Sequence, residues 1–117
     1  PIQRVSTEDA VKLARKAYEA GITFFDTARF YTDSEEKLGE AFDGMREKVY
    51  IATKTAAKNA DEFWEQLGIS LHNLRTDYID IYQFHNPSFC PKPWQAAWRW
   101  AAPKASTPRR FPVSSPT

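Results

Sequence analysis

The sequence of 117 residues predicts an α/β fold: a partial (β/α)8 TIM barrel of about three βα units, with a disordered C-terminal tail. Amphipathic helical segments alternate with short β-rich runs, and the connections between them are short. The order αβαβαβ favours parallel strands joined by right-handed crossovers. The composition changes after Pro93, which predicts the tail. We therefore expect two parts, residues 1–93 and residues 94–117.

The first predicted helix is capped by Ser6 or Thr7 and ends at Gly21. Its inward stripe is predicted to contain Ala10, Leu13, Ala14, Ala17 and Ala20. The apolar run that follows, ITFFD at 22–26, predicts a short strand.

The second predicted helix follows the segment DSEE, in which Asp33 and Glu36 have the spacing of a capping box. Its inward face is predicted to contain Leu38, Ala41, Phe42 and Met45. Its solvated face is predicted to contain Glu35, Glu36, Lys37 and Glu40. The run KVYIATK at 48–54 then predicts a second strand, covered on both faces.

Asn59 and Glu62 repeat the capping-box spacing before a third helix. One stripe of this helix is predicted to contain Phe63, Leu67, Ser70, Leu71 and Leu74. The run YIDIYQFH at 78–85 predicts a third strand. Asp80 alternates with the isoleucines on either side of it, so we expect its side chain to pair or cap on the helical side.

Parallel strands of this kind fit either an open doubly wound sheet or an arc of a barrel. The sequence has no G-x-G-x-x-G turn, which argues against a dinucleotide-binding Rossmann unit. Strand alternation puts an ionisable residue at the carboxyl end of one face of each strand: Asp26, Lys54 and His85. Functional groups of a barrel gather at this edge, so we expect these three to converge, with Tyr31 supplied by the loop after the first strand.

Such a group of residues suits the polarisation of a carbonyl group. A phenol is a weak acid with an ordinary pKa of about 10. An adjacent ammonium favours the phenolate and so strengthens proton donation, while a carboxylate holds that ammonium in place. A histidine adds a hydrogen bond to the carbonyl oxygen, and another molecule must supply the electrons. Taken singly, each residue has a structural alternative, but their joint spacing favours the catalytic interpretation.

At these positions the chain resembles the aldo-keto reductases. The matching text is GITFFDTARFYTDSEEKLGEAF, VYIATK and SLHNLRTDYIDIYQFH, and the start, PIQR, resembles bacterial members. The resemblance implies a (β/α)8 barrel that reduces small aldehydes or ketones with NADPH, less often NADH. It implies that Tyr31 donates the proton, that Lys54 and Asp26 tune it, and that His85 orients the carbonyl. Asp26 also lies near the nicotinamide ribose in the family, so it is a candidate cofactor-binding residue.

The family barrel has about 250 residues or more, so we expect these 117 residues to contain neither its first strand nor its later strands. We expect the resemblance to end at Pro93 and the chain to be a truncated or frameshifted product. An arc of a barrel exposes sheet edges and an apolar inner face, so we expect the fragment to be inactive alone and to self-associate. A non-catalytic barrel fragment or regulatory subunit is the alternative.

The remaining composition predicts a cytoplasmic protein, and the resemblance implies a small-molecule carbonyl substrate. The single cysteine, Cys90, excludes an intramolecular disulfide, and no signal peptide or long apolar run is visible. No cysteine-rich pattern indicates a metal site. Residues 94–117 carry four basic residues, no acidic residue and three of the four tryptophans. We expect neither nucleic acid nor membrane as a partner, and keep a tail that binds a membrane surface or nucleic acid as a further alternative.

Overall fold

The computed structural model describes residues 2–86, which form three helices, three strands and two short 3₁₀ turns. The helices are α1 (Thr7–Glu19), α2 (Ser34–Ala41) and α3 (Ala60–Asn73). The strands are β1 (Phe24–Asp26), β2 (Tyr50–Thr55) and β3 (Ile81–Phe84). The 3₁₀ turns are η1 (Ile2–Arg4) and η2 (Arg46–Lys48). The boundary at Pro93, the predicted tail and Cys90 lie outside the described residues.

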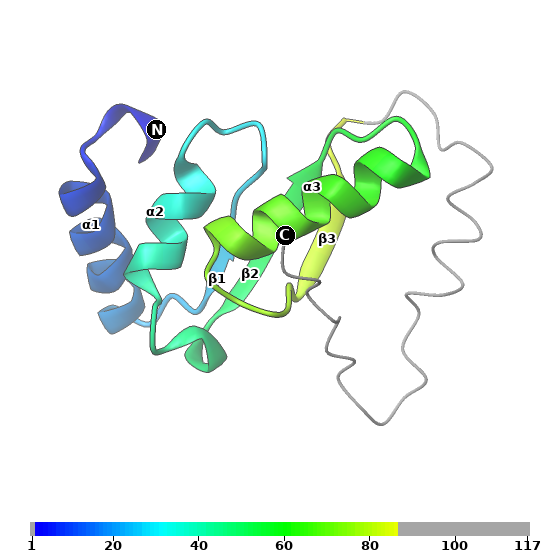
Figure 1. The fold of residues 1–117 in the computed structure, drawn as a ribbon. Coiled ribbons are helices and arrows are strands. Elements are labelled where there is room, and N and C mark those ends of the chain that lie inside the picture. The colour runs from blue at the N-terminus through cyan, green and yellow to red at the C-terminus, as the bar shows by residue number, and fades with distance from the viewer. Residues whose placement is uncertain (1, 87–117) are drawn as a thin grey trace.

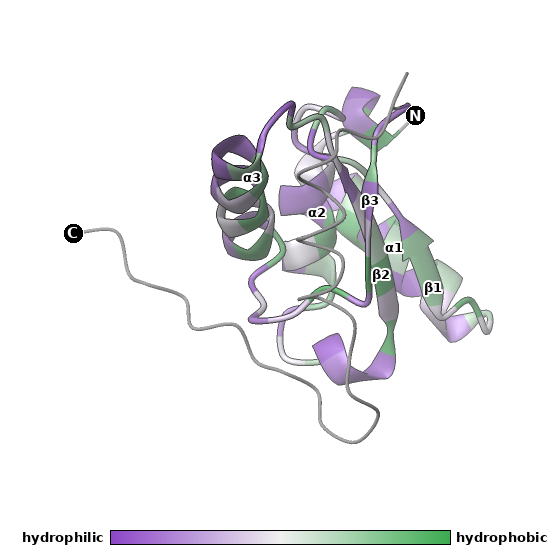
Figure 2. Cartoon of the chain, turned by 90° about the vertical axis from the view of Figure 1, so that its right-hand side faces the viewer, coloured by the Kyte–Doolittle hydropathy of each residue, from purple (hydrophilic) through white to green (hydrophobic). Residues whose placement is uncertain are grey.

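The three strands form one parallel sheet in the order β1-β2-β3, as the alternating pattern predicts. Asp26 pairs with Ala52 in the register between β1 and β2, and Lys54 pairs with Gln83 between β2 and β3. Helices α2 and α3 lie together on one side of the strands, and α1 packs beside α2 (Figures 1 and 2). This arrangement is a three-stranded arc of the predicted barrel.

The core lies between the outward face of the sheet and the helices. Its buried apolar cluster contains Ala14, Leu38, Ala41, Phe42, Val49, Ile51 and Leu74. The stripe predicted for α2 belongs to this cluster or packs against it, so that prediction is confirmed. The stripe predicted for α3 is also confirmed by burial, because Leu67, Ser70, Leu71 and Leu74 are buried and Phe63 is half-buried. The prediction for α1 is wrong in part: Leu13 is 60% exposed and Ala20 is also exposed, whereas Val11 and Tyr18 pack against the core. The reason is that α1 contacts α2 through a stripe turned slightly from the predicted one.

Two of the three predicted helix caps form. Ser6 Oγ accepts a hydrogen bond from the backbone N–H of Asp9, and Asn59 Oδ1 accepts one from the N–H of Glu62. Asp33 is the N-cap residue of α2 but makes no side-chain capping bond. The Asp33 carboxylate lies 2.9 Å from the ammonium of Lys37 instead, so the predicted capping box is wrong because an ion pair takes its place.

The predicted solvated face of α2 is also wrong in part. Glu35 and Lys37 are each 2% exposed, whereas Glu36 and Glu40 are exposed. Lys37 donates hydrogen bonds to the carbonyl oxygens of Ile2 and Val5, because the N-terminal segment folds over it. Glu35 is covered by β2 and α3, whose hydroxyl groups satisfy it.

The other face of the sheet is open in the described residues. Phe24, Tyr50 and Ile81 share this face and are 49%, 60% and 41% exposed. In β2 only Tyr50, at the amino end, is exposed, whereas Ala52 on the same face is 1% exposed and Lys54 is half-buried, so the prediction of a second strand covered on both faces is confirmed beyond Tyr50. None of the helices within residues 2–86 has the length and apolar character needed to cross a membrane.

Candidate active site

Two neighbouring strands bring the first two predicted residues into contact. The ammonium of Lys54 lies 2.7 Å from the Asp26 carboxylate and donates to the carbonyl oxygen of Thr27 at 2.9 Å. The parallel register explains this contact, because Asp26 pairs with Ala52 and Lys54 follows two residues later on the same face. The lysine therefore compensates the carboxylate at the end of β1, as the sequence predicts.

The loop after β1 carries Tyr31 back over the same edge. Pairing with β2 continues beyond the strand, since the N–H of Thr27 donates to Ala52 O at 2.8 Å and that of Arg29 to Lys54 O at 3.0 Å. The N–H of Tyr31 then donates to Ala28 O at 3.0 Å in a tight turn. As a result, the Lys54 ammonium lies 5.6 Å from the centre of the Tyr31 ring.

His85 completes the group from the third strand. Its backbone N–H donates to the carbonyl oxygen of Thr55 at 2.8 Å, which extends the ladder one residue beyond β3. The imidazole stands edge-on to the Tyr31 ring, with ring centres 5.6 Å apart, and to the Phe30 ring at 6.1 Å. Its Nδ1 atom is buried and has no hydrogen-bond partner in the described part of the chain.

All four predicted residues therefore lie together at the carboxyl edge of the sheet. The arrangement has a phenol, a cation held by a carboxylate, and an imidazole within one contact network. Groups of these types can polarise a carbonyl and deliver a proton to its oxygen. The geometry agrees with the predicted convergence, and the catalytic role of each residue stays a prediction.

A set of buried hydroxyl contacts, which was not predicted from the sequence, lies behind this edge. Thr53 Oγ1 donates to Glu35 Oε1 at 2.6 Å, and Thr55 Oγ1 donates to Gln66 Oε1 at 2.6 Å. The hydroxyl groups of Thr27 and Ser34 lie 2.7 Å apart. The sequence contains a sign of these contacts, because Thr53 and Thr55 alternate along one face of a strand that is otherwise suited to burial.

A second tyrosine lies on the opposite face of the sheet from Tyr31. Burial raises the pKa of Tyr82 to about 12, and the nearby Glu35 carboxylate adds to this effect. The neighbouring hydroxyls of Thr55 and Ser70 act in the other direction. Tyr82 therefore remains a neutral phenol far above neutral pH, and it faces the helices, away from the candidate site.

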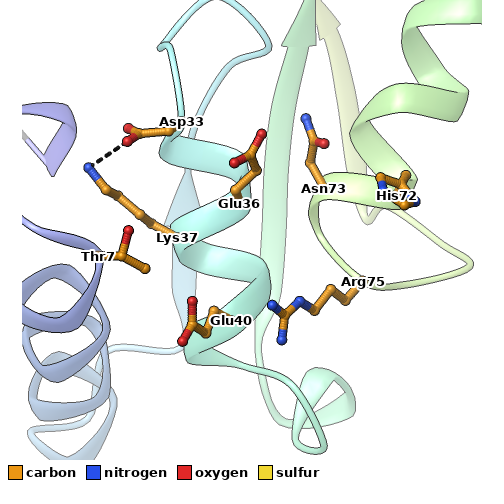
Figure 3. Close-up of a pocket in the computed structure, with 8 residues that line it drawn as sticks. All are labelled: Thr7, Asp33, Glu36, Lys37, Glu40, His72, Asn73 and Arg75. Atoms are coloured by element: carbon orange, nitrogen blue, oxygen red, sulfur yellow. Dashed lines mark ion pairs between the residues drawn. The ribbon is translucent and has the colours of Figure 1, made fainter.

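A polar hollow among the described residues lies elsewhere. It has a volume of about 440 Å³ and is lined by Thr7, by polar residues of α2 and by His72, Asn73 and Arg75 near the end of α3 (Figure 3). None of the four site residues lines it. Residues 2–86 contain no cluster of three or more histidine, cysteine or acidic side chains that could hold a metal ion.

Comparison with known proteins gives a consistent result. The model of the aldo/keto reductase family matches residues 2–104, so the resemblance extends beyond Pro93, where we expected it to end. The chain is 39% identical over 79 residues to the methylglyoxal reductase of Escherichia coli, covering 64% of this chain and 28% of that protein. It is 35% identical over 107 residues to the 6-dehydroglucose reductase of Novosphingobium aromaticivorans, covering 76% and 35%.

Solved structures show the same likeness. The aldo-keto reductase from Klebsiella pneumoniae in complex with NADPH superposes with a TM-score of 0.71 and 31% identity, covering 80% of this chain and 35% of that one. The chain thus spans about a third of the length of the curated relatives it matches.

Proposed function

Because the chain belongs to the aldo/keto reductase family, we propose that it supplies the carbonyl-polarising and proton-donating part of an NADPH-dependent reductase. The observation that carries this proposal is the contact network of Asp26, Lys54, Tyr31 and His85 at one sheet edge. The substrate class is a small aldehyde or ketone. Several relatives act on such compounds by name, among them the methylglyoxal reductase of Escherichia coli.

In this proposal Tyr31 donates the proton to the carbonyl oxygen. The Lys54 ammonium, 5.6 Å from the tyrosine ring centre, stabilises the phenolate that remains. Asp26 and the Thr27 carbonyl hold this ammonium on one side of the phenol. His85 hydrogen bonds to the same carbonyl oxygen and fixes its direction relative to Tyr31.

NADPH fits one part of this arrangement. Asp26 uses Oδ2 for Lys54 and its side chain is 51% exposed, so its other oxygen can accept a hydrogen bond from a ribose hydroxyl. When bound, the cofactor supplies the hydride that reduces the carbonyl carbon. We assign no other cofactor contact to residues 2–86, and NADH is the alternative cofactor.

Turnover requires more of the barrel than this arc contains. The site stands at the rim of a sheet whose inner face exposes Phe24, Tyr50 and Ile81. An open site keeps water around the reacting groups, which weakens the electrostatic effects on which the chemistry depends. We therefore propose that the 117-residue chain alone does not oxidise NADPH, and that its exposed apolar face favours self-association.

A chimera tests this function. Residues 2–86 replace the matching segment of the Klebsiella pneumoniae reductase, and NADPH oxidation is followed with methylglyoxal as the substrate. We expect turnover by the chimera and none by the 117-residue chain. A folded chimera that binds NADPH but does not turn over would refute the assignment.

A further inference from the structure

The two neighbours of Lys54 in β2 are held from the helical side. Thr53 and Thr55 are both fully buried, and their hydroxyls donate to Glu35 of α2 and Gln66 of α3. Successive side chains of a strand point to opposite faces. These two contacts therefore fix the rotation of the strand on the helical side, and Lys54 is directed to the opposite, open side.

Burial of the Glu35 carboxylate costs free energy, which is unusual for a contact with only a structural role. Glu35 is 2% exposed, and three neutral groups donate hydrogen bonds to its carboxylate: Thr53 Oγ1 at 2.6 Å, Ser70 Oγ at 2.7 Å and Asn73 Nδ2 at 3.2 Å. A buried carboxylate is expensive unless its hydrogen bonds compensate it. Charged acceptors make shorter and stronger bonds than neutral ones, so the same carboxylate holds Thr53 firmly.

The residue before Glu35 makes the equivalent contact on the other strand. Ser34 Oγ lies 2.7 Å from Thr27 Oγ1, and Thr27 directly follows Asp26. The first turn of α2 thus contacts the neighbour of Asp26 and the neighbour of Lys54 through two consecutive side chains. This turn connects both members of the ion pair to one rigid element.

We propose that Glu35 is a positioning residue, which holds Lys54 within reach of Asp26 and Tyr31 through its hydrogen bond to Thr53. The importance of that position for catalysis rests on the proposed function. The placement of Lys54 by Glu35 does not depend on the proposed function, so it can be measured without an activity assay.

Two substitutions separate positioning from general stabilisation. Thr53→Val and Ser70→Ala each remove one hydroxyl donor to the same oxygen, Oε1 of Glu35. Both hydroxyls belong to residues with no exposed surface, but only Thr53 is a neighbour of Lys54. The readout is the rate of trace acetylation of each lysine in the 117-residue chain, measured by mass spectrometry.

We expect Thr53→Val to raise the acetylation rate of Lys54 on the order of tenfold, the change for loss of a hydrogen bond to a charged group. Ser70→Ala should leave the rate of Lys54 unchanged. Glu35→Gln keeps the oxygen acceptor and should protect Lys54 better than Glu35→Ala does. Lys37, buried on α2, reports on the fold as a whole, and exposed Lys58 calibrates the reagent.

Three results would overturn the proposal. The first is an unchanged acetylation rate of Lys54 in Thr53→Val. The second is an equal rise of this rate in Ser70→Ala. The third is a rise in the acetylation rate of Lys37 together with that of Lys54, which would indicate a general loosening of the fold. These acetylation rates are independent of the chimera assay. An inactive chimera with a protected Lys54 would refute the function and leave the positioning role standing.

Discussion

The ammonium of Lys54 lies 2.7 Å from the carboxylate of Asp26 across two neighbouring parallel strands. The lysine side chain is 18% exposed and the aspartate side chain 51%, so the cation is the more buried partner. Pairs this accessible contribute about 0–1 kcal/mol to stability. The contact therefore matters more for the placement of a charge beside Tyr31 than for the fold.

Replacing Lys54 by methionine should separate these two effects. We expect Lys54→Met to lower kcat of the chimera by about 10²–10⁴-fold, since the proton donor loses its adjacent cation. The free energy of unfolding of the 117-residue chain should change by less than about 1 kcal/mol. Lys58→Met, at an exposed position, serves as the control. Full kcat in Lys54→Met would remove the lysine from the mechanism.

Gly39 permits the close approach of α2 to the end of α3. A Cβ atom at this position would lie 2.1 Å from the carbonyl oxygen of Asn73 and 2.9 Å from backbone atoms of Leu74. Gly39→Ala should therefore destabilise the chain by about 1–3 kcal/mol or more in chemical denaturation. Gly68→Ala in α3 meets nothing within 4 Å and should stabilise by up to about 1 kcal/mol. Equal effects at the two glycines would contradict this packing.

A partly buried ion pair fixes the opposite, amino-terminal edge of the sheet: the side chain of Arg46 is 10% exposed and that of Asp80 is 21% exposed. Asp80 Oδ2 accepts hydrogen bonds from Arg46 Nη2 at 2.7 Å and from the N–H of Ile51 at 2.9 Å. Asp80→Ala leaves both donors without this partner and should cost about 1–3 kcal/mol of unfolding free energy. Asp43→Ala removes the partner of Arg75 from an exposed pair and should cost less than about 1 kcal/mol. Similar losses for the two variants would show that burial does not control their energies.

Tyr82 should make stability fall at alkaline pH. Its folded-state pKa, about 12, lies above the ordinary value of 10.0, so the unfolded chain loses this proton first as the pH rises. The contribution of this pKa shift to the free energy of unfolding is complete below pH 10 and is lost between about pH 10 and pH 12. In this range the free energy of unfolding falls by at most about 1.4 kcal/mol per pH unit. Tyr82→Phe should flatten the curve of unfolding free energy against pH in this range. An unchanged slope in Tyr82→Phe would mean that the folded-state pKa of Tyr82 is not raised.

The sequence predicted the parallel three-stranded arc and the neighbourhood of Asp26, Tyr31, Lys54 and His85, because strand alternation and the carboxyl-edge rule are local or topological. It did not predict the burial of Glu35 and Lys37. Their burial depends on which neighbours cover α2, namely β2, α3 and the N-terminal segment. A charge pattern on one helix carries no information about such partners, so the hydroxyl contacts behind Lys54 became visible only in the structure.

The most direct test of the account compares two tyrosines in the same chimera. We predict that Tyr31→Phe lowers the rate of NADPH oxidation with methylglyoxal by about 10²–10⁴-fold, because the phenol that donates the proton is lost. Tyr82→Phe removes a phenol from the helical side of the sheet and should keep the rate. Retained activity in Tyr31→Phe, or an equal loss in both variants, would contradict the assignment of this edge as the active site.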